Sequence, residues 1–83
     1  MIMRKYSEYE ILDFMWHTAR DYMPIQTALD PVCGILIGEL EEIGLVGEVV
    51  AKEKASRIIQ VGEHQFRVYY RDKFVPYDVR IVK

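Results

Sequence analysis

Arginine and tyrosine alternate with other residues near the end of this chain, in a pattern suited to contact with an anionic polymer. Arg67, Tyr69 and Arg71 occupy every second position, and Arg80 lies in a later alternating segment. Alternate side chains of a strand point to one face of a sheet. Cations beside an aromatic ring suit phosphate contact and base stacking. We therefore predict that these four residues form a nucleic-acid-binding face.

A second group of cations precedes this segment. Lys52, Lys54 and Arg57 flank a predicted hairpin loop, where they would reach the phosphates of the same ligand. The alternative is that the arginines of the predicted face only solubilise it, beside Glu48 and Asp78, because charged residues commonly cover the outer face of an antiparallel sheet.

Residues that perform catalysis or bind metals are few. His17 and His64 lie on different predicted elements, and no serine lies in a nucleophile motif. Cys33 is the only cysteine, so it forms no disulfide within the chain, and we expect it to be buried. We predict no catalytic residue, no metal site and no cofactor, and thus a protein that is not an enzyme.

A predicted helix over 31–43 offers a different surface. Its first half is apolar almost all round, which exceeds what one core-facing stripe requires. Either the rest of the domain covers this surplus or a partner protein does. The partner surface would comprise Val32, Ile35, Ile37 and Glu39.

The elements that hold these groups begin with a well-marked helix. Ser7 and Glu10 form a capping box, which predicts a helix from Glu8 to near Tyr22, before Pro24. A stripe at helical spacing would face the core, and it consists of Leu12, Met15, Trp16, Ala19 and Met23.

Two further helical segments are predicted before the sheet. Residues 24–30 could form a short second helix, although there is barely room for one, and Asp30 followed by Pro31 predicts the N-cap and first residue of the next helix. That helix should end at Ile43, where Gly44 supplies a left-handed cap.

The rest of the chain has the pattern of antiparallel strands. Gly62 and Glu63 fit a two-residue turn, and residues 72 and 73 a further turn. Pro76 before the last strand predicts an edge position. The predicted strands cover residues 46–52, 57–61, 65–71 and 77–82.

Residues 7–61 resemble the winged helix-turn-helix superfamily. Leu36, the segment 40–46 and the strand-turn-strand after it carry the resemblance. It implies a small α+β domain of two or three helices followed by an antiparallel sheet of three or four strands, and a role in DNA binding and transcription regulation. Members that read DNA usually place polar or basic residues where this chain has Pro31 to Gly34. The resemblance therefore implies phosphate contact through the wing more than base readout by the helix.

Composition fits one small soluble domain over residues 1–83, with a helical part over 7–44 and a β part over 45–83. The 83 residues are 51% hydrophobic and 29% charged, with a net charge of −2. The chain has no secretory signal pattern and no apolar run long enough for a membrane span. With a single cysteine, this predicts a cytoplasmic protein that has no membrane partner.

Charge is divided unevenly between the two parts. Residues 1–44 hold three basic and eight acidic side chains, and residues 45–83 hold eight basic and five acidic ones. This polarity favours an anionic partner for the β part. The sequence thus predicts a non-enzymatic nucleic-acid-binding regulator, and its alternative is a protein-interaction module, either an adaptor, an inhibitor or a dimerising subunit.

Overall fold

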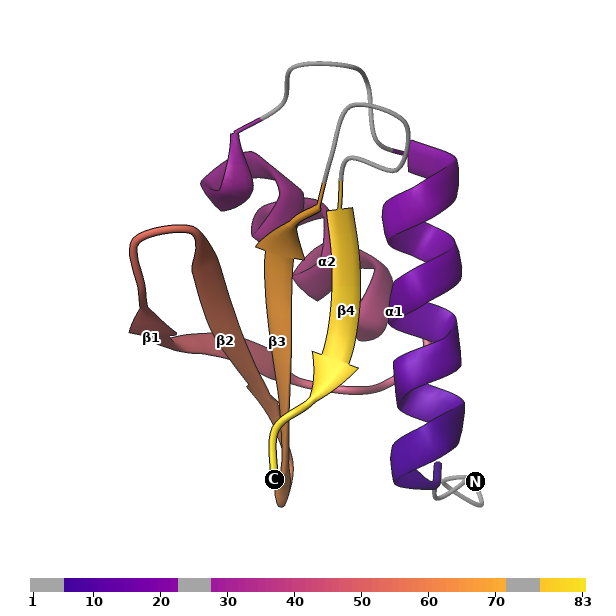
Figure 1. Cartoon of the computed structure of the whole chain (residues 1–83). Coiled ribbons are helices and arrows are strands. Elements are labelled where there is room, and N and C mark those ends of the chain that lie inside the picture. Colours follow the sequence, from indigo (N-terminus) through magenta and orange to yellow (C-terminus); the bar gives the residue numbers. More distant parts are fainter. Residues whose placement is uncertain (1–5, 23–27, 72–76) are drawn as a thin grey trace.

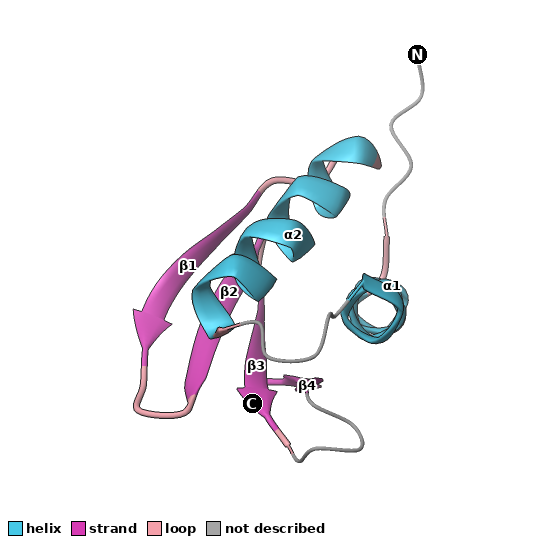
Figure 2. Ribbon diagram, turned by 90° about the horizontal axis from the view of Figure 1, so that it is seen from above, coloured by secondary structure: helices cyan, strands magenta, loops and turns pink. Residues whose placement is uncertain are grey.

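The computed structural model describes residues 6–22, 28–71 and 77–83. Two helices precede a four-stranded antiparallel sheet whose strand order is β1-β2-β3-β4. Helix α2 lies behind the sheet and α1 runs beside β4, so within these described residues the opposite face of the sheet carries no helix (Figures 1 and 2). The elements are α1 (Glu8–Tyr22), α2 (Leu29–Glu42), β1 (Gly47–Lys52), β2 (Ser56–Val61), β3 (His64–Tyr70) and β4 (Tyr77–Ile81).

Helix α1 begins at the predicted residue with the predicted capping box. The Glu10 amide donates to Ser7 Oγ at 3.2 Å, and the Ser7 amide donates to Glu10 Oε1 at 3.0 Å. These two bonds satisfy amide groups that a helix start leaves without intrahelical partners. Ile11, Met15 and Ala19 form the buried stripe of the helix. The capping box therefore fixes where α1 starts, and this stripe fixes which side faces the core.

Helix α2 begins earlier than the sequence predicts. Its N-cap is Ala28, which makes no side-chain capping bond, so Asp30 and Pro31 lie within the first turn. Asp30 does not cap because its carboxylate accepts from Arg57 Nε at 2.9 Å. Pro31 is tolerated there because amides of the first turn have no intrahelical acceptor. The prediction that Asp30 is the N-cap is therefore wrong.

The end of α2 matches the prediction within one residue. Gly44 has φ of +84°, the left-handed conformation expected after a helix. Its amide donates to Glu41 O at 3.0 Å, and the Leu45 amide donates to Leu40 O at 2.9 Å. This pair of bonds is a Schellman motif, which satisfies the last carbonyls of the helix and turns the chain into β1.

The sheet has two differently protected edges. In β1 the register shifts between Val49 and Ala51, which places a bulge in that edge strand. In β4, the other edge, the Val79 amide donates to Asp78 Oδ1 at 2.9 Å. A bulge and a side chain bonded to an edge amide both hinder pairing with further strands. The predicted edge position of the last strand is confirmed.

The core lies between the helices and the inner face of the sheet. Phe66 and Val68 of β3 are completely buried, as their alternation with Arg67 and Tyr69 predicts. The buried apolar side chains come from both helices and from three strands: Ile11, Met15, Ala19, Val32, Cys33, Leu36, Leu40, Ile59, Val61, Phe66, Val68, Tyr77 and Val79.

The short helix that the sequence suggests over residues 24–30, between the two long ones, is not seen in the described residues. Most of the segment 24–30 lies outside them, as does the predicted turn at 72 and 73, and Leu29 and Asp30 belong to α2. The structure is an α+β fold of two helices and four antiparallel strands. The winged-helix resemblance is not confirmed.

Two exposed glycines in α2 lead to a prediction about stability. A Cβ added at Gly34 or Gly38 would meet nothing within 4 Å. Because glycine in a helix costs about 1 kcal/mol relative to alanine, we expect Gly34→Ala and Gly38→Ala each to raise the free energy of unfolding by about that amount. Urea denaturation measures the change.

Gly44→Ala is the matched control for these two substitutions. A side chain at φ of +84° is strained, so this variant should lose stability. A loss of stability in Gly34→Ala or Gly38→Ala would contradict the contact geometry described for α2.

Candidate nucleic-acid interface

The face of the sheet that carries no helix holds the residues predicted to bind nucleic acid on β3 and β4. Arg67 pairs with Arg80 across the two strands, and Tyr69 pairs with Asp78. The Arg80 guanidinium lies over the Tyr69 ring, 6.0 Å from its centroid. We call the group of Arg67, Tyr69, Arg71 and Arg80 the arginine face. Their alternation on antiparallel strands places them together, as the sequence predicts.

Asp78 organises the arginine face. It lies on the outer side of β4, yet it is only 6% exposed. Tyr69 Oη donates to its Oδ2 at 3.0 Å, and guanidinium nitrogens of Arg71 and Arg80 lie 3.8 Å from the same oxygen. Burial and then the bond to Asp78 raise the pKa of Tyr69. The phenol therefore stays protonated at neutral pH and fixes the ring in place.

Glu53 anchors the third arginine. It lies in the loop between β1 and β2, where its Oε1 accepts from Ser56 Oγ at 2.7 Å and from Arg67 Nε at 3.0 Å. These two donors, the serine first, lower the pKa of Glu53. Two carboxylates, those of Glu53 and Asp78, thus hold the three guanidinium groups in position on this face.

The other predicted cations lie elsewhere. Arg57 is 17% exposed at its side chain, and besides Asp30 it donates to the carbonyls of Glu53 and Ser56 at 2.7 and 2.8 Å. Lys52 Nζ also lies 3.9 Å from Asp30, whose pKa is lowered chiefly by the bond from Arg57. These two cations connect the start of α2 to the hairpin and do not join the arginine face. Lys54 is exposed in the loop between β1 and β2.

The predicted partner surface on α2 is mostly covered. Val32 is completely buried in the core, so it cannot contact a partner in the folded domain. Ile37 is half-buried and packs against the core, and Ile35 and Glu39 are half-buried. Helix α2 has more apolar residues than one core-facing stripe needs because it packs against three strands and α1. The inclusion of Val32 in the partner surface is therefore wrong.

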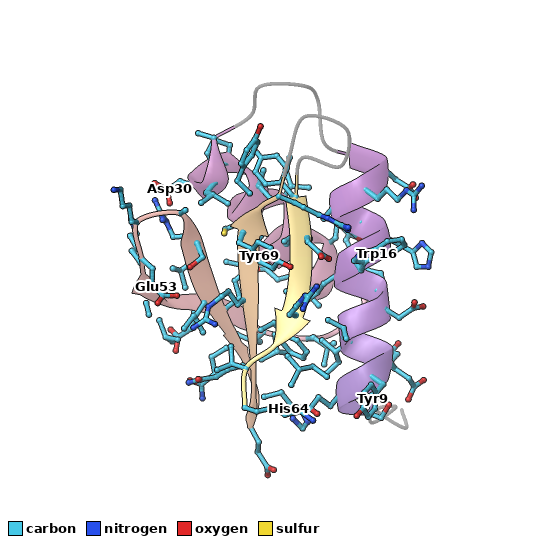
Figure 3. The ribbon with its side chains drawn as sticks, viewed as in Figure 1. Tyr9, Trp16, Asp30, Glu53, His64 and Tyr69 are labelled. Atoms are coloured by element: carbon cyan, nitrogen blue, oxygen red, sulfur yellow. The ribbon has the colours of Figure 1, made fainter. Side chains whose placement is uncertain are left out.

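Trp16 was predicted to lie in the core, but it is partly exposed and lies outside the buried cluster. It lines a groove of about 420 Å³ between α1 and β4, with Tyr9, Leu12, Asp13 and Arg80 among its neighbours. The Arg20 guanidinium lies 5.1 Å from the centroid of the Trp16 ring. Figure 3 shows Trp16 on α1 and Tyr69 on β3, on either side of β4.

The spacing of apolar residues along α1 indicates which side chains line this groove. Residues 11, 15 and 19 form the buried stripe, and the adjacent stripe contains Leu12 and Trp16. The sequence does not tell which of the two adjacent stripes faces the core. That depends on the position of α1 beside the last strand, which only the fold determines.

The cysteine of the chain is buried, and its two histidines each lie beside a carboxylate. Cys33 is buried, and burial raises the pKa of its thiol to about 11, so it is protonated at neutral pH. His64 Nδ1 lies 3.3 Å from Glu8, and His17 Nε2 lies 3.4 Å from Asp13. Within residues 6–22, 28–71 and 77–83, no three histidine, cysteine or acidic side chains gather as metal ligands.

The sequence matches no protein-family model and no curated protein, and the fold matches no solved structure. Neither α1 nor α2 is long and apolar enough to cross a membrane. Function is therefore inferred from the chain's own residues, with the arginine face as the candidate site.

Proposed function

We propose that this protein is a non-enzymatic nucleic-acid-binding regulator that holds single strands on its arginine face. The observation that carries the proposal is the position of three arginines and Tyr69 together on a sheet face without a helix. Guanidinium groups bind phosphate, and an aromatic ring on a sheet gives a base a surface for stacking. The network of Glu53 and Asp78 holds these side chains before a ligand arrives.

Single strands fit this surface better than a duplex. Base readout in a duplex uses an element that enters the major groove, usually a helix with polar side chains. Here α2 lies behind the sheet and ends in acidic residues. An open sheet face instead suits splayed bases and a backbone that runs across the strands. The alternative of a partner surface on α2 has less support, because Val32 is buried.

Binding of a fluorescently labelled oligonucleotide of about ten nucleotides, within the usual site size of small binding domains, tests the proposal. Anisotropy should rise with protein concentration at low salt. If three arginines contact phosphates, log K should fall against log salt with a slope of about −2, from roughly −0.7 for each contact on a single strand.

A duplex of the same length is the matched control, and it should bind more weakly. An unchanged anisotropy for the single strand at low salt would refute the proposal. A slope near zero would show that the arginines do not contact phosphates.

A further inference from the structure

Two aromatic side chains, each next to an arginine, lie on opposite sides of β4. Arg80 lies over Tyr69 on the arginine face, and Arg20 lies over Trp16 on α1. Arg80 also lines the groove that contains Trp16, so one side chain belongs to both surfaces. Figure 3 shows Tyr69 and Trp16 at a similar level along the strands. The groove is therefore continuous with the arginine face.

The lining of the groove indicates what part of a strand fits it. Trp16 and Leu12 provide flat and apolar surface, and Asp13, whose side chain is 73% exposed and lies 3.4 Å from His17 Nε2, also lines the groove. A phosphate would be repelled by Asp13 and would gain nothing from the apolar wall. A nucleobase gains from stacking, and a base with an exocyclic amino group can also donate to a carboxylate.

The cations at the rim suit the backbone on either side of that base. Arg80 is 72% exposed at its side chain, and Arg20 is exposed on α1. Both can turn toward phosphate without leaving the protein surface, because arginine has a long side chain and a planar head with several donors. The groove thus offers a base an apolar wall with an exposed carboxylate beside it, and it offers the phosphates two nearby arginines.

We propose that the groove between α1 and β4 is a base-binding subsite that stacks one amino-bearing base on Trp16 as a single strand leaves the arginine face. The proposal rests on the proposed function and extends the binding surface from the arginine face across β4 to α1. It makes Trp16 a ligand contact, Asp13 the acceptor for the amino group, and Arg20 a phosphate contact.

Trp16 is the only tryptophan of the chain, so its fluorescence reports on this groove alone. The experiment titrates the whole protein with oligodeoxycytidine at low salt and records tryptophan emission and the anisotropy of a labelled strand together. We expect emission to be quenched at the same concentrations that raise the anisotropy. Trp16→Leu should weaken binding about tenfold, as the loss of one stacked base does, and Trp16→Phe should weaken it less.

Oligodeoxyuridine tests the role of Asp13, because uracil has a carbonyl oxygen where cytosine has an amino group. The wild type should prefer oligodeoxycytidine, and Asp13→Asn should reduce this preference. Tyr70→Leu is the matched control, since Tyr70 is an exposed aromatic side chain that contacts Tyr77 and does not line the groove. Circular dichroism confirms that each variant is folded.

The outcomes separate this proposal from the proposed function. If the strand binds but tryptophan emission stays constant and Trp16→Leu binds like the wild type, the groove is not a subsite, whereas binding to the arginine face stands. If the wild type binds no strand at low salt, both proposals fail. Quenching with equal loss of affinity in Trp16→Leu and Tyr70→Leu would also overturn the subsite.

Discussion

Arg80→Glu and Arg67→Glu are each expected to weaken single-strand binding about tenfold or more at low salt, because each removes a phosphate contact and adds a repelling charge. Arg80 is largely exposed, and its guanidinium lies 3.8 Å from Asp78, so its replacement should leave the fold intact. Each variant should also lower the magnitude of the salt slope by about 0.7. Anisotropy titrations over a series of salt concentrations measure both quantities.

Lys52→Glu makes the same change in charge at a different place. Lys52 lies beside Asp30 near the start of α2, outside the arginine face. We expect this variant to bind single strands with nearly wild-type affinity. Equal losses in Lys52→Glu and Arg80→Glu would mean that net charge, and not the arginine face, governs binding. An Arg80→Glu variant with wild-type affinity would argue against the site altogether.

Phe66→Ala is expected to cause the largest loss of stability. Phe66 is completely buried in β3, and its register partners are Ile59 on β2 and Ile81 on β4. Removal of a buried phenylalanine ring costs about 3 to 5 kcal/mol, because apolar contacts are lost and a cavity remains. The total free energy of unfolding of a small domain is about 5 to 15 kcal/mol. Urea denaturation should therefore show a midpoint far below that of the wild type.

Two further variants support this measurement. Phe66→Leu keeps most of the volume and should lose less stability, which gives a value even if the alanine variant does not fold. Val46→Ala removes methyl groups from a side chain that is 79% exposed, so its free energy of unfolding should stay near that of the wild type. A loss below 1 kcal/mol in Phe66→Ala would contradict the position of Phe66 in the core.

Much of the secondary structure follows from local signals in the sequence. The capping box of Ser7 and Glu10 fixes the start of α1, and Gly44 fixes the end of α2. The alternation around Phe66 gives both the strand and its buried face. The start of α2 was mistaken because Asp30 bonds to Arg57, a residue 27 positions later. A local pattern does not reveal such a contact.

The candidate site was predictable only in part. Arg67, Tyr69 and Arg80 share a face because strands alternate, and this is visible in the sequence. Their carboxylate partners are not, because Glu53 and Asp78 reach them through the pairing of strands. The side of the sheet that the helices cover is likewise a property of the whole fold. For this reason the sequence placed Trp16 in the core, whereas the structure places it in a groove.

The position of α1 beside β4 has a consequence for how the domain folds. Each strand is paired with the next one along the chain, so the sheet is built from contacts of short sequence separation. Such contacts cost little loop-closure entropy. The contact of α1 with β4 instead joins the first element to the last. Among the element contacts described, this one closes the longest loop, and the groove of Trp16 exists only after the two distant ends of the fold have met.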